Sequence, residues 1–156
     1  MPSATPTDLA LRPAALEDAA DVARVHLLSR KTAVASGAMP PGIHGDSDVE
    51  AWLAARLQVD EVWVAEVDAV VVAYLRLTEE WLDDLYVVPD RSGQGIGSAL
   101  LELAKALRPA GFGLWVFETN LGARRFYASA GLVEGELTDG SDNEERAPDV
   151  RMLWIP

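Results

Sequence analysis

The spacing of apolar residues, together with helix-capping residues, predicts four helices along the chain. The first is expected over residues 16–30, where one face carries Leu16, Ala20, Ala23 and Leu27. The second begins at Asp46 or Ser47, either of which can cap it, and runs to about residue 58. The third and fourth are expected over residues 95–107 and 121–130.

Segments rich in Val, Leu and aromatic residues predict strands between these helices. The expected strands cover residues 9–13, 61–67, 70–78, 81–88, 111–117, 132–138 and 149–154. The resulting order is βααβββαβαββ. Because hairpin-like strands precede one βαβ crossover, we predict an α/β (α+β) fold with a mixed, mostly antiparallel, twisted sheet of about seven strands flanked by four helices.

No repeat or linker divides the chain, and its 156 residues suit one domain. We therefore expect a flexible leader over residues 1–8 and a single domain over residues 9–156. The polar segment 139–148 is either a mobile lid or a surface loop.

The net charge of −12 changes which partners are plausible. It disfavours nucleic acid, whose phosphates need Lys and Arg, and it favours cationic partners such as protonated amines. An acidic surface that only keeps the protein soluble explains the charge equally well. No apolar run approaches the roughly 20 residues needed to cross a bilayer, and the first residues lack the order of a signal peptide. We expect a cytoplasmic protein that binds neither membrane nor nucleic acid.

The chain contains no cysteine, which excludes disulfides and thiolate catalysis. His26 and His44 are its only histidines. No spacing of His, Asp and Glu supplies the further ligands that a metal would need, so no metal site is predicted.

A glycine-rich turn separates the expected strand 81–88 from the expected helix 95–107. Glycines at alternate positions let the backbone fold tightly and approach a ligand closely. Unpaired amides at the start of the helix, together with the helix dipole, form a site for an anion such as a pyrophosphate. The residues predicted to bind in this way are Ser92, Gly93, Gln94, Gly95, Ile96, Gly97 and Ser98.

Three phosphate-bearing ligands compete for this turn. A P-loop requires a lysine directly after its last glycine, whereas Ser98 follows Gly97 here. A dinucleotide-binding turn requires Gly-x-Gly-x-x-Gly, and Ser98 or Leu100, depending on the register, stands where the last glycine belongs. Coenzyme A is the third ligand. A tight strand–helix connection without any ligand also stays open.

The turn resembles the first signature of the GNAT acetyltransferase superfamily, which reads Gln/Arg-x-x-Gly-x-Gly/Ala between the fourth strand and the third helix. Gly95 and Gly97 match its two small positions, and Ser92 stands where Gln or Arg is usual. Residues 120–132 are similar to the second signature, in which an Asn leads into a helix bearing Ala, then Phe-Tyr, then Gly-Phe. The matching residues are Asn120, Ala123, Phe126, Tyr127, Gly131 and Leu132.

The resemblance implies an N-acetyltransferase with acetyl-CoA as the acyl donor and a primary amine as the acceptor. It places Leu85, Tyr86 and Val87 along the pantetheine arm, where two strands splay apart, and it places Asn120 and Tyr127 at the cofactor. Tyr127 is then expected to protonate the leaving thiolate, because a phenol with a pKa of about 10 stays protonated at neutral pH. A tyrosine that is merely packed in the core is the alternative.

The acceptor amine must lose a proton before it attacks, and several carboxylates are candidate bases: Glu79, Glu80, Asp83, Asp84 and Glu118. We select Asp84 and Asp83 as the catalytic candidates. They point to opposite faces of a regular strand, so at most one is expected to face the site. A water chain is the alternative to a direct base. Near the nucleotide phosphates, the acidic surface is expected to be offset by Arg91, Lys105, Arg124 and Arg125.

Other functions remain compatible with the pattern. The same fold can serve as a non-catalytic module that binds acyl-CoA or a protein partner, because fold does not fix function. An NAD- or nucleotide-binding domain is a third reading. The acceptor stays open among protein N-termini, lysines, polyamines, aminoglycosides and small amines. Dimers are common in the family, but the sequence shows no interface.

Overall fold

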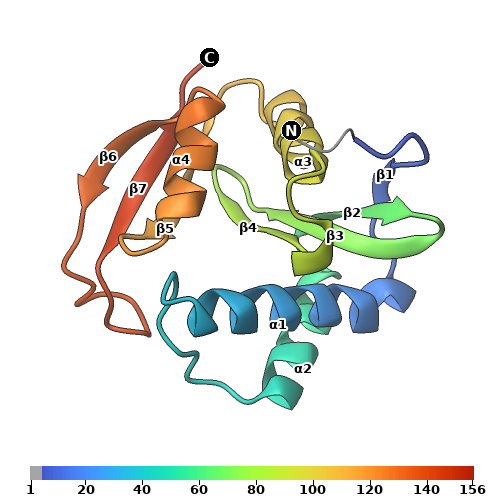
Figure 1. Ribbon diagram of the computed structural model, residues 1–156, viewed down its shortest axis with the longest axis horizontal. Coiled ribbons are helices and arrows are strands. Elements are labelled where there is room, and N and C mark those ends of the chain that lie inside the picture. Colours follow the sequence, from blue (N-terminus) through green and yellow to red (C-terminus); the bar gives the residue numbers. More distant parts are fainter. Residues whose placement is uncertain (1–4) are drawn as a thin grey trace.

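Helices and strands follow the predicted order βααβββαβαββ in the computed structural model, which describes residues 5–156 (Figure 1). The helices are α1 (Ala19–Ala35), α2 (Asp46–Arg56), α3 (Ile96–Leu107) and α4 (Leu121–Ser129). The strands are β1 (Ala10–Pro13), β2 (Glu61–Val67), β3 (Val70–Leu77), β4 (Leu82–Val87), β5 (Phe112–Phe117), β6 (Val133–Leu137) and β7 (Asp149–Trp154). Residues 1–4 of the expected leader lie outside the described residues.

The first helix differs from its predicted bounds at both ends. A 3₁₀ turn over Leu16–Asp18 precedes α1, and the Asp18 carboxylate anchors it by accepting hydrogen bonds from the Ala15 amide (2.7 Å) and the Arg12 guanidinium (2.7 and 2.9 Å). The helix then continues five residues past Arg30, to Ala35, because no residue interrupts it before Gly37 (φ +82°). The prediction that it ends at residue 30 was wrong.

The strands form two sheets instead of the single mixed sheet that we predicted. One sheet has the order β1-β2-β3-β4 and the other the order β5-β7-β6, and all neighbours within each sheet are antiparallel. Among the described residues, the sheets meet through one isolated parallel bridge, between Trp81 and Gly113. A Cβ atom on Gly113 would come within 2.9 Å of the Trp81 ring, so only glycine allows this approach. Beyond the bridge, β4 and β5 are left as two edge strands without a shared ladder.

Helices cover both faces of the first sheet (Figure 1). α1 and α2 lie against one face and α3 lies against the other, while α4 lies beside the second sheet. Apolar side chains from both sheets and from the helices make one core, whose fully buried members include Leu53, Val64, Leu75, Leu100 and Met152. Within residues 5–156, no helix has the length and apolar character that crossing a bilayer would require.

Candidate functional site

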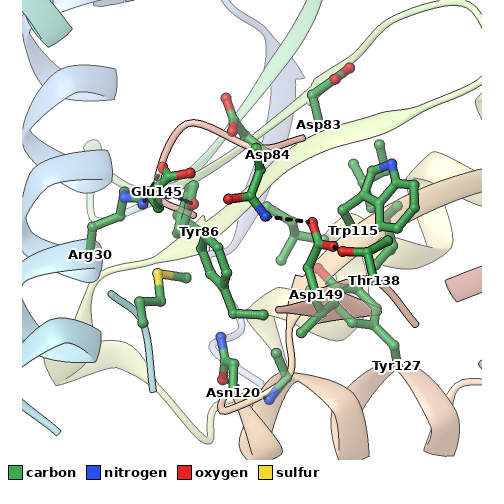
Figure 2. A pocket seen from close by; sticks show the side chains of 18 of the residues that line it. Arg30, Asp83, Asp84, Tyr86, Trp115, Asn120, Tyr127, Thr138, Glu145 and Asp149 are labelled. Carbon is green, nitrogen blue, oxygen red and sulfur yellow. Dashed lines mark hydrogen bonds and ion pairs between the residues drawn. The ribbon is translucent and has the colours of Figure 1, made fainter. Parts of the chain in front are cut away.

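A cavity of about 670 Å³ opens between β4 and β5, which we call the wedge cavity (Figure 2). It lies where the two sheets separate beyond the Trp81–Gly113 bridge. β4, β5, the start of α4 and the loop 139–148 all contribute to its wall. Six residues singled out from the sequence line it together: Asp83, Asp84, Leu85, Tyr86, Asn120 and Tyr127.

Tyr127 is positioned by α4. The Asn120 side-chain oxygen caps this helix by accepting a hydrogen bond from the Ala123 amide (3.2 Å). The Tyr127 ring is packed edge-on against Phe126, with 5.1 Å between ring centroids, and 8% of the residue is exposed. Its hydroxyl has no hydrogen-bond partner within the described chain, and burial raises the pKa of Tyr127 above its ordinary value. A phenol in this state is a proton donor facing an open cavity.

A β-bulge in β4 changes what the two neighbouring carboxylates can do. The β3–β4 register shifts so that Arg76 pairs with Asp84 and Leu77 pairs with Leu82, which leaves Asp83 as the extra residue. Asp84 is buried and Asp83 is exposed, yet both line the wedge cavity. The expectation that at most one of them faces the site assumed a regular strand, and the bulge removes that assumption.

Both carboxylates already have partners. Asp84 accepts a hydrogen bond from Arg76 Nε (2.7 Å), and Asp83 accepts one from the Thr78 hydroxyl (2.7 Å). Partial desolvation by the surrounding protein raises the pKa of Asp83, even though its side chain is exposed. Asp83 is therefore protonated more readily than an ordinary aspartate.

The glycine-rich turn lies at the N-terminus of α3 and does not line the wedge cavity. Gly93 and Gly95 adopt φ angles of +76° and +78°, which glycine tolerates best. No acceptor for the amides from Gly93 to Ser98 exists in the described part of the chain, whereas the next amide, of Ala99, bonds to the Gly95 carbonyl (3.0 Å). The turn therefore offers a row of free N–H groups at a helix start, as predicted.

Several neighbours of this turn also bear on ligand binding. Ile96 is buried in the core, and the Ser92 hydroxyl donates to the Pro89 carbonyl (2.9 Å). Thr5 lies so close to the turn that a Cβ atom on Gly95 would sit 2.5 Å from its hydroxyl oxygen. A Cβ atom on Gly97 would touch Val87 and Phe126 at 3.7 and 3.5 Å, which places the turn against residues adjacent to Tyr86 and Tyr127.

The Val87 carbonyl, part of the predicted pantetheine track, accepts a hydrogen bond from the Ser29 hydroxyl (2.9 Å). Among the basic residues expected near the phosphates, Arg124 is paired with Glu134 (2.8 Å) and Lys105 with Glu102 (3.2 Å). Arg91 reaches Gln94 at 3.4 Å, within the turn itself. Arg91 therefore lies within the glycine-rich turn, and Arg125 is exposed on α4.

A second cavity of about 610 Å³ lies on the side of α1 and α2, and we call it the helix-side cavity. It shares Arg30, Asp84 and Glu145 with the wedge cavity, so the two spaces adjoin at these residues. Its other lining residues come from α1, α2 and the loops 37–45 and 139–148: His26, Gly42, Ile43, His44, Asp48, Val49, Trp52 and Glu144.

Polar contacts join the parts of this boundary. Arg30 donates to the Tyr86 hydroxyl (3.1 Å) and lies 3.6 Å from a Glu145 carboxylate oxygen (Figure 2). His44 and Glu144 approach to 3.2 Å and so connect the loops 37–45 and 139–148. Asn143 closes the second loop on itself through hydrogen bonds with the Ala147 backbone (2.6 and 3.1 Å). The segment 139–148 is therefore an ordered wall of both cavities.

Sequence reasoning missed Arg30 and Glu145, which line both cavities, and Arg76, which binds Asp84. Arg30 and Glu145 are more than a hundred positions apart, and no local pattern marks either as a site residue. No cluster of His, Asp and Glu suited to a metal ion is found within residues 5–156.

Comparison with known proteins relates this chain to one family and to several similar chains. Residues 58–134 match the family described as "Acetyltransferase (GNAT) domain". An uncharacterised N-acetyltransferase of Archaeoglobus fulgidus is 37% identical over 60% of this chain and 72% of its own length. The peptidyl-lysine N-acetyltransferase YjaB of Salmonella typhimurium is also 37% identical, over 60% of this chain and 64% of its own length. A GCN5-related N-acetyltransferase structure from Rhodopseudomonas palustris superposes with a TM-score of 0.78 at 28% identity, covering 100% of this chain and 99% of that one.

Proposed function

Because this chain belongs to the GNAT superfamily of N-acetyltransferases, we propose that it moves an acetyl group from acetyl-CoA to a primary amine, which attacks the thioester directly. The family prediction, the enzyme class and acetyl-CoA as the acyl donor are confirmed by this membership. The observation that carries the direct-attack proposal is the partnerless Tyr127 hydroxyl beside a cavity between two diverging edge strands.

The donor binds, in this proposal, along the edge of β4. The diphosphate lies on the amides from Gly93 to Ser98, because free N–H groups at a helix N-terminus attract anions. The pantetheine arm follows Leu85, Tyr86 and Val87 as an added strand, since β4 has no strand partner on that side among the described elements. Asn120 keeps its side-chain nitrogen available, since only its oxygen is used in capping α4.

Tyr127 supplies the proton for the departing thiolate. Its raised pKa keeps the phenol protonated across the neutral range, so it can donate but does not compete as a base. Main-chain amides at the edge of β4 are placed to hold the thioester oxygen while negative charge develops on it.

The charge of the wedge cavity supports an amine acceptor. Arg30 is the one basic residue lining it within the described chain, against the carboxylates of Asp83, Asp84, Glu136, Asp142, Glu145 and Asp149. Such a wall attracts an ammonium group and repels an anionic acceptor. Asp83 and Asp84, the bases selected from the sequence, belong to this wall. Residues 9–156 act as one catalytic domain in this proposal, because both sheets contribute to the cavity. A cytoplasmic location and a homodimer stay predictions.

The proposal is tested by measuring free thiol released from acetyl-CoA across a panel of acceptors. The panel contains an alkyl monoamine, a diamine, a polyamine, an aminoglycoside, a lysine-containing peptide with a blocked N-terminus, and a peptide with a free N-terminus only. The lysine peptide is included because one relative carries a peptidyl-lysine name. We expect amine-dependent thiol release matched by the acetylated product in mass spectrometry. Clear binding of acetyl-CoA with no release for any acceptor would contradict the transfer and favour a binding module.

A further inference from the structure

A buried chain of polar side chains ends at the helix-side cavity, and the reaction as described so far does not use it. We propose that His26, at the end of this chain, accepts the proton that the acceptor ammonium must lose, and that Tyr74 and Asp84 position its imidazole ring. This inference rests on the proposed amine transfer and adds to it the residue that activates the acceptor.

This series of hydrogen-bonded and ion-paired side chains runs from β3 and β4 to α1. Arg76 holds the Asp84 carboxylate at 2.7 Å and also the Asp60 carboxylate at 2.8 Å. The Tyr74 hydroxyl oxygen lies 2.7 Å from His26 Nδ1, and the charge of the buried Asp84 carboxylate acts on both Tyr74 and His26. Tyr74 is fully buried and His26 is 8% exposed, so the ring has little freedom to turn.

The proposal requires one of the two imidazole tautomers. The Tyr74 hydroxyl can donate to or accept from His26 Nδ1, and in the base form proposed here its oxygen accepts from Nδ1–H. The lone pair then resides on Nε2, as it does when a carboxylate orients the histidine of a catalytic triad.

His26 Nε2 remains accessible. It has no hydrogen-bond partner in the described part of the chain, and it is not fully buried. It is therefore open to the helix-side cavity that His26 lines. His26 lies edge-on to Tyr86, with 5.0 Å between ring centroids, and Tyr86 lines the wedge cavity. His26 therefore lies between the helix-side cavity, which it lines, and Tyr86, which lines the wedge cavity.

The proton balance is complete without another reactant. His26 Nε2 takes one proton from the ammonium, which leaves a neutral amine and an imidazolium. The amine nitrogen bonds to the acetyl carbon, the carbon–sulfur bond breaks, and the thiolate takes a proton from Tyr127. Tyr127 recovers its proton from the nitrogen of the collapsing intermediate, and the imidazolium releases its proton to water through the helix-side cavity. The products are the acetamide, the thiol of coenzyme A and one proton.

The surroundings favour a neutral imidazole at rest. Burial lowers the pKa of His26 below its ordinary value of 6.5, opposed by the Asp84 charge and assisted by Arg30 and Arg76. The titratable and charged groups that face the ring or its cavity are Arg30 on α1, Asp48 on α2, Tyr74 and Arg76 on β3, Asp84 and Tyr86 on β4, and His44, Glu144 and Glu145 on the two loops. The base form is therefore the populated form at neutral pH, and it is lost as the pH falls.

The test is the pH profile of kcat/KM for the best amine of the panel, in wild type and in His26→Gln. We expect an acidic limb with an apparent pKa below 6.5 in wild type. In His26→Gln we expect a loss of roughly 100-fold at neutral pH, because general base catalysis contributes about 10² to 10⁴, and we expect the acidic limb to disappear. The Kd for acetyl-CoA, measured by calorimetry, stays unchanged. His44→Gln, the matched variant at the other histidine, keeps the acidic limb whatever its effect on KM.

Tyr74→Phe provides a second arm that keeps the ring packing and removes the hydrogen bond. We expect its acidic limb to move to lower pH, because the imidazolium loses an acceptor for Nδ1–H. This arm decides the matter if His26→Gln does not fold. The role of His26 is overturned if the acidic limb persists in folded His26→Gln or does not move in Tyr74→Phe. In either case, turnover by the wild type still supports amine transfer. If wild type acetylates no amine at all, the proposed function itself has failed.

Discussion

The two sides of the site are built from different parts of the polypeptide. On the proposed donor side, the glycine-rich turn and the edge of β4 present mainly backbone groups. On the proposed acceptor side, which comprises the helix-side cavity and its boundary with the wedge cavity, the wall consists of charged and aromatic side chains held by other side chains. A backbone site depends on a few glycines close in sequence, whereas a side-chain site depends on residues brought together only by folding.

This difference predicts that donor binding tolerates substitution better than acceptor binding does. Backbone amides are insensitive to most substitutions, so a diphosphate site survives sequence change as long as the turn keeps its shape. A wall of side chains such as Arg30, Asp84 and Glu145 changes with each substitution. A variant should therefore weaken donor binding only where it alters the backbone of the turn.

The largest effect is expected at Tyr127, where the two sides meet. Tyr127→Phe removes the proton donor and keeps the packed ring, so kcat should fall by about 10² to 10⁴. The Kd for acetyl-CoA should change little, because the donor is held by backbone groups. Thiol-release assays measure kcat, and calorimetry measures the Kd for acetyl-CoA. An unchanged kcat would show that water, not Tyr127, protonates the thiolate.

A large effect on folding is expected on the acceptor side. Arg76→Leu leaves the Asp84 and Asp60 carboxylates without their shared cation, and the side chains of Arg76 and Asp84 are only 9% and 8% exposed. Removing one partner of a buried ion pair destabilises by about 3–5 kcal/mol. Urea unfolding measures the loss. The control is Lys31→Ala, which breaks an exposed pair with Asp46 and should cost less than about 1 kcal/mol. Equal losses in the two variants would contradict the buried network.

A smaller effect, confined to donor binding, is expected in the glycine-rich turn. Gly95→Val forces a β-branched residue to φ +78° and brings its Cβ to 2.5 Å from the Thr5 hydroxyl oxygen. Strain of about 1–3 kcal/mol in this turn should weaken acetyl-CoA binding roughly tenfold or more. Ser92→Ala, which removes a side chain and leaves the amides in place, should change the Kd by less than about threefold, since it adds no strain. If Ser92→Ala weakens binding as much as Gly95→Val does, the donor side depends on side chains after all.

Local patterns were sufficient for most of the fold and for the glycine-rich turn. Helical spacing and β-branched runs gave the element order, and glycine spacing gave the turn, because both are recorded in neighbouring residues. The resemblance implied that two strands splay apart, but local patterns did not show two separate sheets that meet only where Trp81 approaches Gly113 in the described chain. The bulge at Asp83 was missed for a related reason: it shows only in the pairing of β4 with β3.

The acceptor side could not be predicted because its contacts join distant positions. His26 and Tyr74 are separated by 48 positions in the chain, yet their polar atoms lie 2.7 Å apart. Considered alone, His26 is a residue on one helix and Tyr74 a residue in one strand. Only the packing of α1 on the first sheet gives the pair a chemical meaning.

The gap between β4 and β5 also affects how the protein survives without its ligand. Each strand ends its sheet, so in the described chain two rows of main-chain groups face a space that no third strand fills. Unshielded edges invite pairing with other chains and hence aggregation, while a ligand that lies between them favours the native state by mass action. The lifetime of this protein in a cell should therefore follow the supply of acetyl-CoA, so that starvation for the donor removes the catalyst as well as the substrate.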